Sequence, residues 1–165
     1  MKNKQIFLFA FIITAILLVS IYIFEKNRIS ADVNGDTIKI GVLLPLTGPS
    51  EPTGKKLKYA IEVAQEIING EHPEIELELG KQLGLPNLNN KKIEFIYSDH
   101  KASPETARNE AQRLIKEEHV AALIGAYHSS ATKTASQVAE EYKVPFLSGS
   151  SSSASLTKRG LKYFS

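Results

Sequence analysis

Hydroxyl side chains are concentrated at two places in this sequence. Ser129 and Ser130 stand together, and a longer serine-rich run fills residues 148–155, within FLSGSSSSASLT. Serine hydroxyls both donate and accept hydrogen bonds, so such clusters can hold a polar ligand, supply a nucleophile or form a solvated connector. The serine-rich run alone does not distinguish these possibilities. The residues around it, and the elements that carry it, have to do so.

A serine nucleophile needs a base within reach, and Asp99, His100 and His128 are the candidates. The pattern G-x-S-x-G, which presents such a nucleophile on a sharp turn between a strand and a helix, is missing. Gly149 is followed by three serines and by no second glycine at the required place. We therefore predict that the chain is not an enzyme.

Spacing also argues against phosphate and metal chemistry. Residues 48–56, GPSEPTGKK, differ from the phosphate-binding loop G-x-x-x-x-G-K-[ST], because Gly54 comes one residue late and Lys56 replaces the hydroxyl. The four histidines form no i, i+4 pair and there is no cysteine, so no metal site and no cofactor are expected. The 20 Lys and Arg are interspersed with 18 Asp and Glu, which leaves no basic stripe for nucleic acid.

Apolar segments alternate with helical patterns along most of the chain. A helical apolar pattern follows each of the first three segments; Asn69-Gly70 ends the first helix, Ser103-Pro104 begins the second, and Ser129 or Ser130 is expected to cap the third. Strands that are apolar throughout predict a parallel sheet with helices on both faces, an α/β fold. Residues 71–90 are expected to form an irregular excursion. The four predicted strands are residues 38–46, 92–99, 120–127 and 143–149.

Parallel sheets of this kind bind ligands beyond the carboxyl ends of their strands, where loops lead into helix N-termini. Both serine clusters lie at such ends. The free N–H groups and the dipole of a helix that begins near Ser129 favour a carboxylate, and the serine-rich run is expected to form a second helix mouth beside it. Carbonyls and hydroxyls from Ser150 to Ser152 could take an ammonium group. The alternative is that the serines only cap helices.

The N-terminal part of the chain predicts a membrane segment. The stretch from Ile6 to Phe24 carries no charge, and as a helix it would span about 28 Å, close to a bilayer's hydrocarbon thickness. The slight excess of basic residues before it favours a cytoplasmic N-terminus. We expect residues 1–30 to be an anchor, with a cleaved signal segment as the alternative, residues 31–37 to be a linker, and residues 38–165 to be the folded domain.

The order of these segments resembles the extracellular solute-binding proteins of branched-chain amino acid ABC transporters, the Leu/Ile/Val-binding type of type I periplasmic binding fold. Five segments carry the resemblance, and their order is more specific than any one of them. They cover nearly all of residues 38–165 and read IKIGVLLPLTGP, the helix leading to INGE, IEFIYSDHKASPETARNEAQRLI, VAALIGAYHSSAT and VPFLSGSSSSASLTKRGLKYF.

The resemblance implies site residues at matching positions. It implies that a ligand's carboxylate is held by Ser129 and by the hydroxyl and amide of Ser152. It implies that the ammonium group meets the carbonyl of Ser150, with Ser151 lining the same turn. A family tyrosine that packs on the ligand falls on Thr53, and this departure argues against a strict preference for branched aliphatic ligands.

The resemblance also implies the function and its partners. We expect a Rossmann-like N-terminal lobe of a protein that captures an amino acid or a similar small polar acid outside the cytoplasm. A second lobe closes on the ligand, and an ABC permease receives it. The chain is expected to hold most of one lobe and none of the second. A disulfide of some members would join the positions of Lys101 and His128 and is absent. The alternative is the ligand-binding ectodomain of a membrane sensory receptor.

Overall fold

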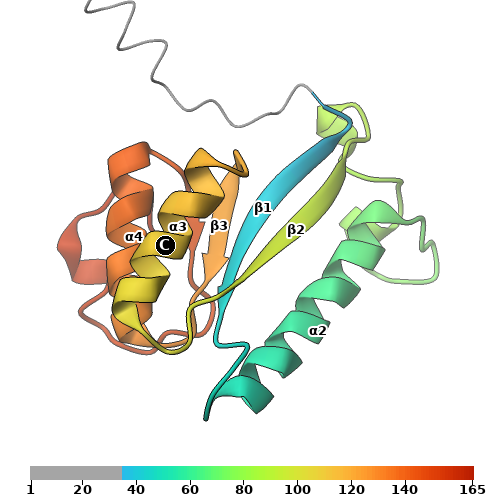
Figure 1. The fold of residues 1–165 in the computed structure, drawn as a ribbon. Helices are drawn as coiled ribbons and strands as arrows, with labels where there is room; N and C mark the ends of the chain where they lie inside the picture. Colours follow the sequence, from blue (N-terminus) through green and yellow to red (C-terminus); the bar gives the residue numbers. More distant parts are fainter. Residues whose placement is uncertain (1–34) are drawn as a thin grey trace, which may run out of the picture.

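The computed structural model describes residues 35–165. They form one parallel four-stranded sheet in the order β2-β1-β3-β4, with helices on both faces (Figure 1). This confirms the predicted α/β fold. The strands are β1 (Thr37–Leu44), β2 (Lys92–Asp99), β3 (Ala122–Gly125) and β4 (Phe146–Leu147), and the helices are α2 (Glu51–Asn69), α3 (Pro104–Lys116) and α4 (Ser129–Tyr142).

The last two strands are shorter than predicted. The backbone N–H of Val144 donates to Ala139 O in α4 at 2.9 Å, so the chain is still tied to the helix where a strand was expected. Pro145, the next residue, has no N–H to donate to a ladder. The excursion between α2 and β2 is irregular as predicted, with two short 3₁₀ helices, η1 (Glu78–Gly80) and η2 (Pro86–Leu88).

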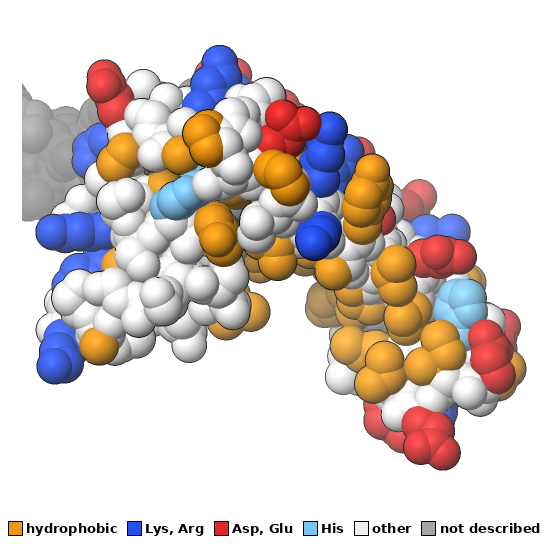
Figure 2. All heavy atoms as spheres, turned by 90° about the horizontal axis from the view of Figure 1, so that it is seen from below, with side chains coloured by type: hydrophobic (Ala, Val, Ile, Leu, Met, Phe, Trp, Pro, Cys, Tyr) orange, Lys and Arg blue, Asp and Glu red, His pale blue; other side chains and the backbone are white. Residues whose placement is uncertain are grey.

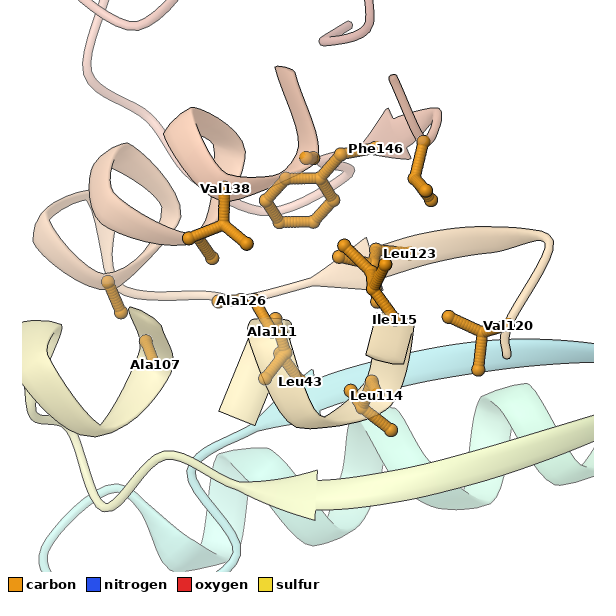
Figure 3. Packing of buried hydrophobic residues seen from close by; sticks show 14 residues of the cluster. Leu43, Ala107, Ala111, Leu114, Ile115, Val120, Leu123, Ala126, Val138 and Phe146 are labelled. Carbon is orange, nitrogen blue, oxygen red and sulfur yellow. The ribbon is translucent and has the colours of Figure 1, made fainter. Parts of the chain in front are cut away.

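The main hydrophobic core lies between the sheet and the pair formed by α3 and α4 (Figure 3). Small residues let the two helices approach the sheet, as at Ala107 and Ala111, while Leu123 and Phe146 fill the space above β3 and β4. This packing fixes the start of α4 relative to the carboxyl ends of the strands. The fully buried members include Leu43, Ala107, Ala111, Leu114, Ile115, Leu123, Ala131, Ala135, Val138 and Ala139.

The opposite face of the sheet carries α2, which packs against β1 and β2 (Figure 1). A side chain at Gly54 would place its Cβ 2.0 Å from the carbonyl oxygen of Pro45, so only glycine allows the first turn of α2 to lie so close to the end of β1. The close approach holds the β1–α2 loop beside the end of the sheet.

The predicted apolar stripe of α2 is only partly buried. The stripe residues Leu57, Ile61, Ala64, Ile67 and Ile68 are half-buried. Outside the stripe, Tyr59 and Val63 of the same helix are 61% and 54% exposed, and further exposed leucines lie in the excursion. Figure 2 shows hydrophobic side chains crowded on the right of the molecule, where α2 and the excursion lie in Figure 1. On the same face of the sheet Leu147 of β4 is 58% exposed. The helix α2 therefore covers β1 and β2 on this face and leaves Leu147 of β4 exposed.

The predicted anchor, residues 6–24, lies outside the described residues. Within residues 35–165, no helix is both long enough and apolar enough to cross a membrane. The first strand begins at Thr37, one residue before the predicted start of the folded domain.

Candidate functional site

The carboxyl ends of all four strands meet at one edge of the sheet, because the strands are parallel. Figure 2 views the molecule from this edge, and the surface on its left, where α3, α4 and the serine-rich run lie, shows a broad area of backbone and uncharged polar side chains with Lys and Arg side chains at its rim. Two contacts join loops at this edge. The hydroxyl of Thr47 donates to Asp99 at 2.5 Å, and Ser50 Oγ lies 3.1 Å from His128 Nε2.

The helix α4 begins with open backbone donors. Its N-cap is His128, in an extended conformation, and the His128 side chain makes no capping hydrogen bond. Thr132 N donates to His128 O at 2.9 Å, but within residues 35–165 the amides of Ser129, Ser130 and Ala131 have no acceptor. Ser129 and Ser130 are therefore first-turn residues, and their prediction as caps was wrong. Three free N–H groups at the positive end of a helix dipole can bind a carboxylate.

The serine-rich run lies against this helix start. Ser129 Oγ accepts a hydrogen bond from the amide of Ser153 at 3.3 Å. Ser151 Oγ donates to Tyr127 O at 3.2 Å and lies 2.5 Å from Thr132 Oγ1. The two strand-end loops that carry the predicted site residues are thus neighbours, and Ser151 faces the protein rather than the solvent.

Ser150 and Ser152 differ from Ser151 in their surroundings. Both are exposed, and their hydroxyls have no hydrogen-bond partner in the part of the chain that the structure describes. They are therefore free to meet a ligand or water. Their predicted roles in binding remain a proposal.

The second helix N-terminus that was predicted after the serine-rich run does not form. The serine-rich run leads into turns and then into a single 3₁₀ turn, η3 (Thr157–Arg159), which ends at Gly160 in the left-handed region with φ of 68°. Leu156 is buried, but no apolar stripe at helical spacing follows it, so nothing favours a longer helix. The serine-rich run therefore offers exposed hydroxyls and loop amides beside one open helix start.

Thr53 lies in the first turn of α2 and is half-buried. The amides around it are already used, since Glu51 N donates to Gly48 O at 3.0 Å and Thr53 N donates to Ser50 O at 3.1 Å. Pro52 has no N–H. The start of α2 consequently offers a ligand the Thr53 hydroxyl and methyl group, but no free backbone donor.

The bases considered for a nucleophile are engaged elsewhere. Asp99 accepts hydrogen bonds from the amides of Leu46 and Lys101. His100 is fully buried, donates from Nε2 to Ala126 O at 2.6 Å and accepts at Nδ1 from Ala102 N at 3.1 Å. Burial lowers the pKa of His100, so the ring is a neutral structural group. Among the described residues, no group of three acidic, histidine or cysteine side chains could hold a metal ion.

Sequence reasoning missed three residues of this edge. Thr132 and Ser50 gave no signal beyond their hydroxyl groups, and His128 was considered only as a base. Each acts through a partner far away in the chain: Thr132 contacts Ser151, and Ser50 contacts His128 across 78 positions. Only the sheet order brings such positions together.

A family model described as periplasmic binding protein matches residues 37–164, and this chain belongs to that family. The family consists of binding proteins, which confirms the prediction that the chain is not an enzyme. A Leu/Ile/Val-binding protein homolog of Brucella abortus is 30% identical over 125 residues, which are 76% of this chain and 28% of the relative.

Solved structures give the same picture. A solute-binding protein of an ABC transporter from Rhodopseudomonas palustris, in complex with 3,4-dihydroxybenzoic acid, matches 79% of this chain and 31% of its own, with a TM-score of 0.63 and 28% identity. The branched-chain amino acid binding protein LivJ of Streptococcus pneumoniae, in complex with isoleucine, matches 78% of this chain and 32% of its own, with a TM-score of 0.63 and 26% identity. The chain spans less than a third of the length of each.

Proposed function

We propose that this chain supplies the carboxylate-binding wall of an extracytoplasmic solute-binding protein that serves an ABC importer. The observation that carries the proposal is the set of three unpartnered amides at the start of α4, beside a loop of uncharged hydroxyls. A full negative charge held by neutral donors at a helix start is stabilised without a buried counter-ion. Family membership supports the same function.

The ligand's carboxylate would accept hydrogen bonds from the amides of Ser129 to Ala131 and from the exposed hydroxyl and amide of Ser152. Each hydrogen bond to a charged group contributes about 1.5 to 3 kcal/mol. An ammonium group would meet the carbonyl of Ser150, while Ser151 holds the turn in place through Thr132. Thr53 would line the wall from the first turn of α2.

An amino acid is the ligand class that would use both the amide donors at the start of α4 and the carbonyl of Ser150. The relatives include one bound to isoleucine and one bound to an aromatic acid, and both ligands carry a carboxylate. The two classes differ in the ammonium group, which the carbonyl of Ser150 would recognise together with an acidic residue of the second lobe. The ammonium group is therefore the feature that the ligand test must vary.

The partners and location follow from the same proposal. An ABC permease would receive the ligand, and the chain would act on the extracytoplasmic face of the membrane, attached through residues 6–24. A reading frame that continues beyond Ser165 into a second lobe and then stops would support transport. One that continues into a second apolar span and a cytoplasmic output domain would support sensing instead.

Thermal shift measurements on the complete protein, with its second lobe, test the ligand class. The panel contains leucine, isoleucine, 4-hydroxybenzoate and, as a control without a carboxylate, glucose. We expect an amino acid to raise Tm, because a ligand that binds only the folded state stabilises it. A rise with glucose and with no acid would overturn the proposal.

Two substitutions of Ser129 distinguish the contribution of its hydroxyl group to ligand binding from that of its backbone N–H. Ser129→Ala removes only the hydroxyl, whereas Ser129→Pro also removes one open N–H. Proline is compatible with the first helical position, because His128 before it is extended. We expect Ser129→Pro to weaken ligand binding more than Ser129→Ala does. Pro104→Ala, at the first position of α3, is the control and should leave ligand binding unchanged.

A further inference from the structure

The N-cap residues of α2 and α4 contact each other. Ser50 precedes α2 and His128 precedes α4, and Ser50 Oγ lies 3.1 Å from His128 Nε2. Neither side chain caps its own helix. In contrast, Ser103 at the start of α3 does so, accepting a hydrogen bond from Thr106 N at 3.2 Å. Two N-cap side chains thus make a contact between loops in place of the usual capping bond.

The backbone explains why Ser50 is available for this contact. Gly48 O and Ser50 O already accept the first amides of α2, so this helix needs no side-chain cap. At α4 the amides of the first turn stay open, and His128 turns its ring toward Ser50 instead of covering them. The contact therefore joins the two loops while leaving the donors of α4 free.

The ring of His128 is held on several sides. It packs edge-to-face against Tyr127 and His100, with ring centroids 4.9 Å and 5.6 Å apart. Its Nδ1 is buried and has no hydrogen-bond partner among the described residues. The contact of Nε2 with Ser50 Oγ is therefore the one hydrogen bond that the ring makes among the described residues.

We propose that His128 is a positioning residue that ties the β1–α2 loop to the start of α4 and so fixes the wall bearing Thr53 relative to the open amides. This inference rests on the proposed binding site at α4. Because Ser129 directly follows His128, the contact fixes the segment between β3 and α4. It also fixes the β1–α2 loop, which carries Ser50. Without it, Asp99 would still hold the β1–α2 loop at Leu46 and Thr47, but this tie between Ser50 and the start of α4 would be lost.

A double-mutant cycle tests the proposal in the complete protein, with its second lobe. The variants are His128→Ala, Ser50→Ala and the double variant, each measured by hydrogen exchange of residues 45–54 and by the affinity for leucine. We expect each single variant to speed exchange in this loop and to weaken leucine binding about fivefold, which corresponds to one neutral hydrogen bond. The double variant should bind leucine no more weakly, and exchange no faster in residues 45–54, than the more strongly affected single variant.

Two further variants separate positioning from general destabilisation. His128→Gln places an amide nitrogen near the position of Nε2, and we expect it to restore slow exchange in residues 45–54. Ser103→Ala removes a genuine cap at α3, so it should lower Tm while leaving that loop and the leucine affinity unchanged.

Additive effects in the cycle, or unchanged exchange in both single variants, would overturn the positioning role. If the complete protein with its second lobe binds no leucine, the proposed ligand fails, yet the exchange data still decide whether the contact holds the loop. The two proposals can therefore fail separately.

Discussion

The hydroxyl of Ser151 lies 2.5 Å from that of Thr132 and gives its own hydrogen to Tyr127 O at 3.2 Å. Thr132 is fully buried and accepts from Ala126 N at 3.2 Å, so its hydrogen points to Ser151. The result is one chain of hydrogen bonds from Ala126 through both hydroxyls to Tyr127. This chain fastens the serine-rich run to the first turn of α4.

Removal of the Ser151 hydroxyl should therefore loosen the fold. Ser151→Ala leaves the Thr132 hydroxyl and Tyr127 O without their partner, and we expect the free energy of unfolding to fall by about 1 to 2 kcal/mol. Ser152→Ala is the matched control, since the Ser152 hydroxyl is exposed and should change stability by less than about 0.5 kcal/mol. Urea unfolding measures both. Equal losses would show that Ser151 is not the fastening residue.

Two glycines near the site are expected to behave oppositely. An alanine Cβ at Gly54 would lie 2.0 Å from Pro45 O, whereas at Gly149 it would meet nothing within 4 Å. Gly54→Ala should lower the free energy of unfolding by about 1 to 3 kcal/mol, because α2 must move away from β1. Gly149→Ala should be neutral or slightly stabilising. A stable Gly54→Ala protein would contradict the close packing of α2.

Local sequence signals predicted the parts of the fold that depend on neighbouring residues. β2 was placed at residues 92–99, and Ser103 with Pro104 marked the start of α3, as observed. The same reasoning placed a cap at Ser129 or Ser130. An N-cap must be non-helical, and the extended residue is His128, whose side chain contacts Ser50, 78 positions earlier in the chain. No local pattern reports such a contact.

The serine-rich run shows the same limit at the site. Its position at a strand end could be predicted, because alternating strands and helices define that edge. Its internal differences could not, since the half-buried Ser151 contacts Thr132 while Ser152 is exposed in the same short run. Which serine faces inward is decided by α4, which the sequence places but does not orient.

Acid should weaken the contact between the loops after β1 and β2. Burial alone would raise the pKa of Asp99, but hydrogen bonds from Thr47, Lys101 and Leu46 outweigh it and hold the pKa below the ordinary value of 3.8. A carboxyl group with a lowered pKa in the folded state stabilises the protein above pH 3.8, and this stabilisation is lost as pH falls through the lower folded value.

Asp99→Asn should accordingly be less stable than the unsubstituted chain at pH 7, and the difference should shrink as pH falls below 3.8. Urea unfolding of both proteins across this range measures the difference directly, which removes the common contribution of other acidic groups. A difference that stays constant with pH would show that the ionised form of Asp99 has no special role.

The segment after the serine-rich run depends on Arg159. Its guanidinium group donates to Leu156 O at 2.8 Å, to Lys133 O at 3.0 Å and to Ser136 Oγ at 2.8 Å. It also lies over the ring of Phe164, 5.1 Å from the centroid. Arg159 thus binds α4 and the chain on both sides of η3 at once.

Lysine keeps the charge of Arg159 but lacks the planar fork that reaches three acceptors. We expect Arg159→Lys to lower the free energy of unfolding by about 1 to 3 kcal/mol and to speed hydrogen exchange in residues 148–160. The neighbouring Lys158 is exposed, so Lys158→Gln should change neither quantity. If Arg159→Lys exchanges as slowly as the unsubstituted chain, packing of Leu156 and Phe164 alone must hold the segment, and the guanidinium contacts are secondary.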